Sequence, residues 1–131
     1  DDTIYGGDGN DLLVGGAGND TFVFDTALNA STNVDSIQDF NANAGDKIHL
    51  DDNVFAQFSV LANTTLAVGN FVANSGGIAG DADDYILYDT DSGALYYDAD
   101  GGDAAGRELV ATLQLTNPAD SFDFGHVKVG V

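Results

Sequence analysis

Residues 6–14 have the sequence GGDGNDLLV, and residues 15–23 follow directly as GGAGNDTFV. The two nonapeptides share glycine at positions one, two and four, Asn-Asp at positions five and six, and a large apolar residue at position eight. Glycine permits the positive φ angles of tight turns, and an apolar residue between two outward-facing neighbours fits a very short strand. So short a period predicts repeated units that stack on one another.

The same register extends backwards to the first residues of the sequence. Residues 1–5 fit the tail of an earlier unit whose glycines are missing, so we expect the sequence to be a piece of a longer protein. The apolar residue at position eight should point inward, and the aspartate at position six should lie at a turn. These pairs are Asp2 and Ile4, Asp11 and Leu13, and Asp20 and Phe22.

The composition restricts the partners of the protein. The 131 residues, of which 44% are hydrophobic, fit a single globular domain, and 22 acidic against 3 basic residues give a net charge of −19. Such a charge repels nucleic acid and anionic lipid, whereas bound cations would relieve it. Without cysteine, disulfides, thiolate metal sites and a catalytic thiol are excluded. No apolar run approaches the ~20 residues of a membrane-spanning helix.

The repeat predicts a site for a hard cation. Successive units turn to opposite sides, so Asp2 should stack over Asp20 with turn carbonyls between them. Calcium takes about 6–8 oxygen ligands in flexible geometry, whereas magnesium requires a stricter octahedron and zinc prefers nitrogen or sulfur. The rival interpretation as a phosphate-binding loop fails because neither unit completes a GxGxxG or GxxxxGK[ST] motif.

This pattern resembles the calcium-binding nonapeptide of RTX (repeats-in-toxin) proteins, G-G-x-G-x-D-x-U-x, in which U is a large apolar residue. The resemblance covers residues 1–24 and implies that Ca²⁺ is bound by side chains and carbonyls of the turns. The residues that it implies are Asp2, Gly6, Gly7, Asp8, Gly9, Asn10, Asp11, Gly15, Gly16, Ala17, Gly18, Asn19 and Asp20.

Residues 21–50 resemble the cap that ends the roll in RTX proteins, with TFVF followed by DSIQDF and GDKIHL. The resemblance implies Asp35 as a further calcium ligand, and either Asp25 or Asn29 as a second. For Asp39 and Asp46 we favour a structural role, in which each carboxylate accepts hydrogen bonds from backbone amides.

Short strands dominate the rest of the chain. We expect strands over residues 65–72, 108–115 and 122–129, a hairpin joining 85–88 to 94–97, and helical turns over 54–58 and from Asn117-Pro118. Residues 98–103 fail as an EF-hand, because position six is Asp103 and position twelve is Leu109. We therefore interpret them as an aspartate-rich turn. The expected fold is all-β: a short parallel β-roll (residues 1–24) with a β-sandwich-like cap (residues 25–131).

The sequence offers no catalytic constellation. His49 and His126 are the only imidazoles, and HExxH and GxSxG motifs are absent. We therefore expect a calcium-binding module that is not itself an enzyme and that folds when it meets calcium outside the cell. The RTX resemblance implies a Gram-negative bacterium, the type I secretion machinery as partner, and a secreted or cell-surface location. The alternative is a calcium-dependent adhesive or glycan-binding domain, in which sugars would stack on exposed tyrosines. The candidates are Tyr85, Tyr88, Tyr96 and Tyr97. We expect at least half of these four to be packed in the core instead.

Overall fold

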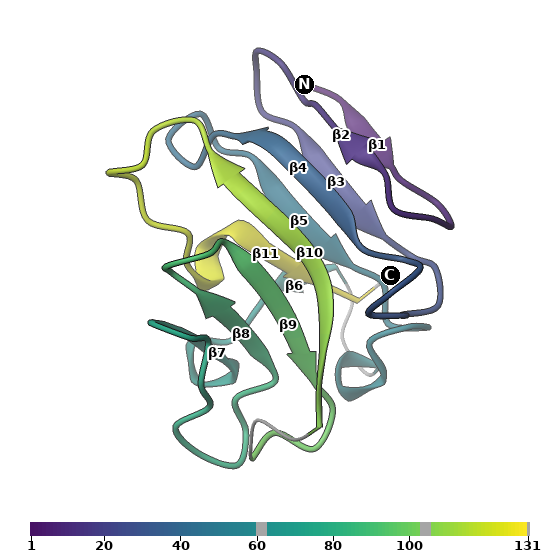
Figure 1. Cartoon of the computed structure of the whole chain (residues 1–131), viewed down its shortest axis with the longest axis vertical. Coiled ribbons are helices and arrows are strands. Elements are labelled where there is room, and N and C mark those ends of the chain that lie inside the picture. The colour runs from purple at the N-terminus through teal and green to yellow at the C-terminus, as the bar shows by residue number, and fades with distance from the viewer. Residues whose placement is uncertain (60–62, 103–105, 131) are drawn as a thin grey trace.

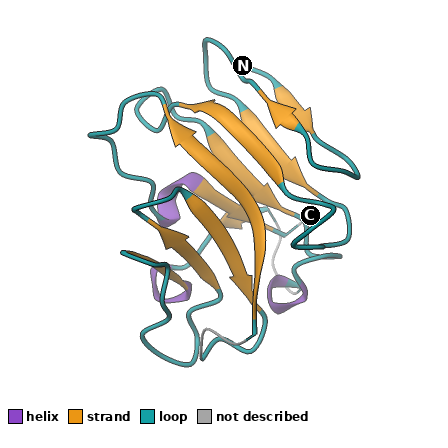
Figure 2. Cartoon of the chain, in the orientation of Figure 1, coloured by secondary structure: helices purple, strands orange, loops and turns teal. Residues whose placement is uncertain are grey.

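The computed structural model describes residues 1–59, 63–102 and 106–130. Strands make up most of the regular structure in these residues, and the helical segments among them are short 3₁₀ turns (Figure 2). The all-β class expected from the sequence is therefore confirmed. In the described residues, no helix has the length and apolar character needed to cross a membrane.

The described strands form two sheets that lie as two layers (Figure 1). The first sheet has the order β1 (Thr3–Tyr5), β3 (Thr21–Phe24), β5 (Lys47–Leu50), β11 (Val127–Val129) and β6 (Thr64–Thr65). The second sheet has the order β2 (Leu12–Leu13), β4 (Asp35–Phe40), β10 (Arg107–Leu115), β9 (Ala94–Asp98), β8 (Ile86–Asp89) and β7 (Phe71–Asn74).

The first five strands alternate between the two sheets along the chain. β1, β3 and β5 are parallel neighbours in the first sheet, and β2 and β4 are parallel neighbours in the second. Each return needs a tight turn, and both nonapeptides make it with the same backbone. The φ angles are 81° and 125° at Gly7 and Gly9, and 82° and 119° at Gly16 and Gly18, values that favour glycine.

Columns of apolar side chains fill the space between the sheets. In the first sheet the register places Ile4, Phe22, Ile48 and Val127 side by side. Phe22 is fully buried, Leu13 of the second sheet is buried, and Ile4 is half-buried against the same core cluster. The predicted inward orientation of the position-eight residues is therefore confirmed. In the second sheet the corresponding column is Leu13, Ile37 and Leu113.

The later strands extend these two sheets. β10 pairs in parallel with β4, and β11 pairs in parallel with β5. Both sheets continue across residue 24, because β2 pairs with β4 and β3 pairs with β5. The predicted hairpin is confirmed, because β8 and β9 are antiparallel around a turn over residues 90–93. The predicted helical turn over residues 54–58 is present as the 3₁₀ turn η1 (Ala56–Phe58).

Three sequence predictions were wrong in detail. Residues 65–72 are not one strand, because the 3₁₀ turn η2 (Val68–Asn70) carries the chain from β6 in the first sheet to β7 in the second. Residues 122–129 are interrupted by η3 (Phe124–His126), whose first amides are capped by the Asp123 carboxylate. No helix follows Asn117, whose carbonyl closes a single turn by accepting the Asp120 N–H at 2.9 Å.

β10 is a strand as predicted, but its inward face differs from simple alternation. Its pairing with β9 shifts register between Leu109 and Ala111. This bulge places Val110 in the core beside Ala111, with exposed fractions of 1% and 0%, whereas Leu109 is only half-buried. A bulge adds one residue to one strand, so the alternation of faces changes at that point.

Candidate metal centre

The position-six aspartates of the first sheet form a column linked by paired hydrogen bonds. The Asp2 N–H donates to Oδ1 of Asp20 at 2.7 Å, and the Asp2 carbonyl accepts the Thr21 N–H at 2.8 Å. One layer on, the Asp20 N–H donates to Oδ1 of Asp46 at 2.9 Å, and its carbonyl accepts the Lys47 N–H at 2.8 Å. The expected stacking of Asp2 over Asp20 is therefore confirmed.

The second sheet repeats this arrangement with Asp11 and Asp35. The Asp11 N–H donates to Oδ1 of Asp35 at 3.0 Å, and the Asp11 carbonyl accepts the Ser36 N–H at 2.8 Å. Asp11 of the second turn is therefore joined to the segment that follows the repeats. Burial raises the pKa of the Asp35 carboxyl above its usual value; the Asp11 N–H lowers this pKa, and the Asp11 carboxylate raises it.

Two of these carboxylates have an oxygen that the polypeptide does not satisfy. Within the described part of the chain, Oδ2 of Asp11 and Oδ2 of Asp20 are buried without a hydrogen-bond partner. Oδ2 of Asp46 differs, because it accepts the Asn41 N–H at 2.8 Å. A buried carboxylate oxygen without a partner is unfavourable unless a cation or a proton compensates it. The Asp11 and Asp20 turns therefore have the unmet oxygen donors that a cation requires.

The first glycine of each nonapeptide allows a carboxylate to approach the turn closely. A Cβ atom placed on Gly15 would lie 2.7 Å from Oδ2 of Asp20, and one placed on Gly6 would collide with Oδ2 of Asp35. Position one therefore requires glycine for space. The donors brought to these turns are carboxylate oxygens, which suit calcium rather than zinc.

The loop after β3 holds the first repeat turn in place. Thr26 Oγ1 donates to the Gly7 carbonyl at 3.0 Å, and Asn33 Oδ1 accepts the Gly9 N–H at 2.9 Å. Asn10 Oδ1 accepts the Val34 N–H at 2.8 Å. Sequence reasoning missed Thr26 and Asn33, because their position against the turn depends on the path of an irregular loop.

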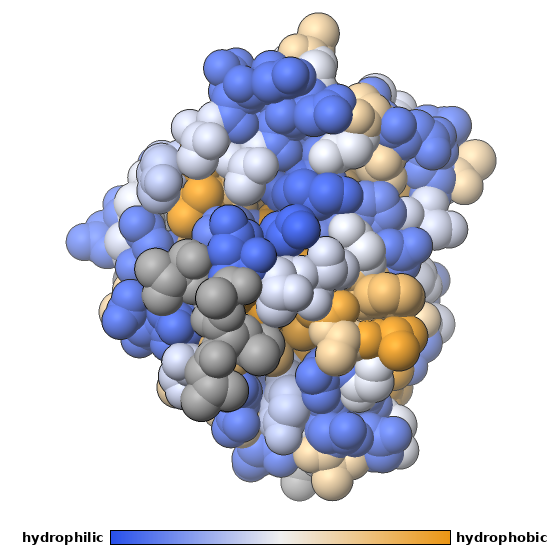
Figure 3. Space-filling model, turned by 180° about the vertical axis from the view of Figure 1, so that it is seen from behind, coloured by the Kyte–Doolittle hydropathy of each residue, from blue (hydrophilic) through white to orange (hydrophobic). Residues whose placement is uncertain are grey.

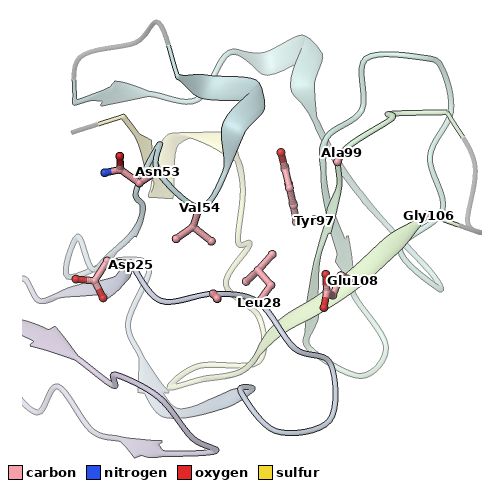
Figure 4. Close-up of a pocket in the computed structure, with 9 residues that line it drawn as sticks. Asp25, Leu28, Asn53, Val54, Tyr97, Ala99, Gly106 and Glu108 are labelled. Carbon is pink, nitrogen blue, oxygen red and sulfur yellow. The ribbon is translucent and has the colours of Figure 1, made fainter.

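The alternatives Asp25 and Asn29 differ in their surroundings. Asn29 Oδ1 accepts the N–H groups of Ser31 and Thr32, both at 3.0 Å, so its side chain closes its own loop. Asp25 is exposed and lines a cleft of about 570 Å³ together with Leu28, Val54, Tyr97 and Glu108 (Figure 4). In that view Leu28 and Val54 lie between the carboxylates of Asp25 and Glu108.

The remaining predicted site residues lie at the turns. Asp8 and Ala17 are exposed, and the Asn19 N–H donates to Oδ1 of Asp1 at 2.6 Å. Asp39 accepts the N–H groups of Gly15 and Gly16, both at 2.8 Å. With the contacts of Asp46 described above, this confirms the prediction that both carboxylates bond backbone amides.

A sequence signal for the full aspartate columns was available. Each column member is followed two positions later by an inward apolar residue, as in Asp20 and Phe22. The same spacing occurs at Asp35 and Ile37, and at Asp46 and Ile48. Asp46 therefore continues the repeat spacing, although it lies outside any complete nonapeptide.

Both histidines contact backbone groups in the described structure. His49 Nε2 lies 2.9 Å from the Gly130 carbonyl, and His126 Nδ1 accepts the Asp123 N–H at 3.1 Å. Among the described residues, no three His, Cys, Asp or Glu side chains converge on one point. A cation at the turns would therefore depend on backbone carbonyls as well as carboxylates.

Comparison with known families identifies the repeat. Residues 1–24 match the family model of the RTX calcium-binding nonapeptide repeat (4 copies). The matched segment contains both glycine turns and the unsatisfied oxygens of Asp11 and Asp20. This repeat family binds calcium and is non-enzymatic, and proteins that carry it are typically secreted. Searches of curated proteins and of solved structures returned no match.

Proposed function

We propose that this chain is a calcium-binding RTX module, in which residues 1–24 end a parallel β-roll and residues 25–131 form its all-β cap. The observation that carries the proposal is the buried, unpartnered Oδ2 of Asp20 at a turn that the calcium-repeat family covers. We place the division at residue 24 from the sequence pattern alone; both sheets continue across this residue through the pairing of β2 with β4 and of β3 with β5.

The proposed ligands come from two sets of turns. Asp20 and Asp2 would bind one ion with carbonyls of residues 6–9 and 15–18. Asp11 would share another with Asp35, to which its backbone already donates a hydrogen bond. Calcium accepts the mixed carboxylate and carbonyl donors that such turns present. Its charge would add to that of the Asp1 ammonium group, which lies 3.4 Å from Oδ1 of Asp20.

Calcium binding is proposed to drive folding of the repeats. The net charge of −19 opposes compaction. The repeat strands are short, and Leu12 and Val14 leave large apolar surfaces exposed, so packing alone stabilises this end weakly. A site that forms only on folding converts binding free energy into folding free energy. Low calcium inside a Gram-negative cell would keep the chain open for type I secretion, and extracellular calcium would fold it.

Amide exchange and circular dichroism during a calcium titration at constant ionic strength test this function. We expect calcium to protect the amides of residues 1–40 strongly and those of the cap less. Magnesium at the same concentration should protect them much less, because it dehydrates reluctantly. Equal protection with chelator, calcium and magnesium would contradict the proposal.

Calorimetry of Asp20→Ala tests the ligand assignment directly. We expect a lower calcium stoichiometry or affinity than in the unmodified chain. An unchanged titration would remove Asp20 from the site.

The adhesive alternative has weaker support from the positions of the tyrosines. Tyr88 and Tyr97 are buried, so at least half of the four pack into the core as expected. The Arg107 guanidinium lies 4.0 Å from the centre of the Tyr96 ring and covers it. A glycan array with and without calcium separates the two functions, since a calcium-dependent glycan signal would favour the adhesive domain.

A further inference from the structure

The turn after β9 contains a second type of unsatisfied carboxylate. Asp98 is fully buried, and its Oδ1 accepts the N–H groups of Asp100 at 3.3 Å and Gly101 at 3.0 Å. Its Oδ2 is buried and has no hydrogen-bond partner in the described structure. Asp98 lies outside both nonapeptides, so the repeat does not account for this oxygen.

A second carboxylate lies beside Asp98. The Asp100 N–H donates to Oδ1 of Asp98, so both aspartates belong to one turn. A Cβ atom on Gly106 would lie 3.0 Å from both oxygens of Asp100, so the start of the next strand closes around this side chain. Two carboxylates in one turn, one of them buried, repel each other unless a positive charge compensates them.

Among the described residues, no basic side chain forms an ion pair with Asp98. Arg107 is its direct partner in the pairing of β9 and β10. The Arg107 guanidinium nevertheless donates to the carbonyls of Gly76 at 2.8 Å and Gly77 at 2.5 Å, and it stacks on the Tyr96 ring. The Arg107 guanidinium therefore contacts other groups and does not pair with Asp98.

The surrounding backbone brings a carbonyl to the same turn. Gly101 has φ of 73°, and a Cβ atom there would collide with the Ala82 carbonyl oxygen and with the Tyr85 ring. The Asp98 N–H donates to the Tyr85 carbonyl at 2.8 Å. The buried Asp84 nearby is already satisfied, since its Oδ2 accepts the N–H groups of Gly80 and Asp81.

We propose that Asp98 and Asp100 bind a hard divalent cation of the calcium class in the cap, at a site separate from the repeats. Oδ2 of Asp98, the Asp100 carboxylate and the Ala82 carbonyl supply oxygen donors only, which is the set that calcium prefers. A cation here joins the turn after β9 to residues 82–85, which precede β8. The site therefore stabilises the cap, where the repeat ions do not reach. Asp103, which the EF-hand comparison considered, lies outside the described residues and has no part in the proposal.

Isothermal calorimetry with calcium alone tests this site on the full chain. Asp98→Asn keeps an acceptor for the Asp100 and Gly101 amides but removes the carboxylate charge. We expect it to lose a single calcium ion per chain, while calcium protection of residues 1–40 is retained. Asp91→Asn is the matched control, because it removes the same charge from an exposed side chain in the neighbouring turn. It should leave the stoichiometry unchanged.

Terbium luminescence gives a second measurement. Terbium(III) replaces calcium, and a tyrosine close to the ion sensitises its emission. Tyr85 contacts this turn, so Tyr85→Phe should reduce the emission of the unmodified chain and have no effect in Asp98→Asn. If Asp98→Asn does not fold, the exposed Asp100→Asn should show the same loss of one ion.

The competing state is a proton shared between Asp98 and Asp100. In that case Asp98→Asn would keep the full calcium stoichiometry, and Tyr85→Phe would leave the terbium emission unchanged; either result would overturn the proposal. The repeat site is tested separately by Asp20→Asn. If Asp20→Asn has no effect while Asp98→Asn loses an ion, the cap site stands and the proposed function fails.

Discussion

Asp20 accepts the backbone N–H of Asp2 through Oδ1 at 2.7 Å, while its Oδ2 is buried and has no partner in the described structure. One oxygen of this carboxylate therefore holds successive units together, and the other is available to a cation. Asp46 occupies the equivalent place in the next layer but has both oxygens bonded to amides. In this column of aspartates, Asp46 is thus fully bonded to amides, whereas Asp20 keeps one oxygen without a partner.

Asp20→Asn should affect stability mainly through calcium. The ion pair that it also removes, between the exposed Asp1 ammonium group and Oδ1 of Asp20 at 3.4 Å, contributes little. The amide keeps an acceptor for the Asp2 N–H and removes a buried negative oxygen, so the calcium-free chain should be no less stable than the unmodified one. At a free calcium concentration 100 times the Kd, binding stabilises the native state by about 2.7 kcal/mol per site. We expect most of one such increment to vanish, as measured by urea unfolding with and without calcium. Loss of stability in chelator alone would contradict this assignment.

Asp46→Asn should behave in the opposite way. Both carboxylate oxygens accept N–H groups, so an amide nitrogen at either position faces another donor. We expect a loss of about 1–3 kcal/mol in the free energy of unfolding, the cost of an unsatisfied buried group. The loss should be the same with calcium and with chelator. A loss confined to the calcium-bound state would instead make Asp46 a ligand.

Gly15→Ala and Gly16→Ala form a matched pair in adjacent positions. Gly16 has φ of 82° with no atom within 4 Å of a placed Cβ, so alanine there introduces backbone strain of about 1–2 kcal/mol. At Gly15 the Cβ would meet Oδ2 of Asp20 at 2.7 Å and displace the carboxylate. Calorimetry should therefore show weaker calcium binding for Gly15→Ala than for Gly16→Ala. Equal affinities would remove the close approach as a requirement of the site.

Asp89 should make the hairpin turn sensitive to acid. Its pKa is lowered from 3.8 to about 2, first by the Ser92 hydroxyl and then by the N–H groups of Gly76 and Asp91. A lowered native pKa adds stability that is complete above 3.8 and is lost as the pH falls toward 2. Carboxyl-carbon NMR should follow this titration, and Asp89→Asn should flatten the pH dependence of unfolding in that range. A measured pKa at or above 3.8 would contradict the assignment.

Monovalent salt should stabilise the calcium-free chain. The net charge of −19 repels itself, and the screening length falls from about 10 Å at 0.1 M salt to about 3 Å at 1 M. The urea midpoint in chelator should therefore rise with sodium chloride, and choline chloride should act alike if sodium does not bind specifically. A midpoint that falls with both salts would show that charge repulsion does not limit folding. Figure 3 shows one face of the molecule, on which hydrophilic residues surround a smaller apolar patch.

The repeat and its register were predictable from the sequence. Position-eight residues such as Phe22 point inward, and position-six residues such as Asp20 stack at turns. Both directions follow from the place of the residue in a nine-residue repeat, which depends only on its neighbours in the chain. The hairpin of β8 and β9 was predictable for the same reason: its turn residues and alternating strands are adjacent in the chain.

Local features were thus readable from the residues alone: all-β strands, glycine turns and the spacing of aspartates. The choice of distant strands that complete the sheets emerged from the folded chain, as where Leu113 pairs with Ile37 and Val127 pairs with Ile48. The tertiary structure also decided that Val110 enters the core at a bulge and that Asp46 is saturated by amides while Asp20 and Asp98 are not. The reason is physical. A hydrogen-bond partner or a packing neighbour tens of residues away is selected by the folded chain as a whole, and no short sequence period encodes that selection.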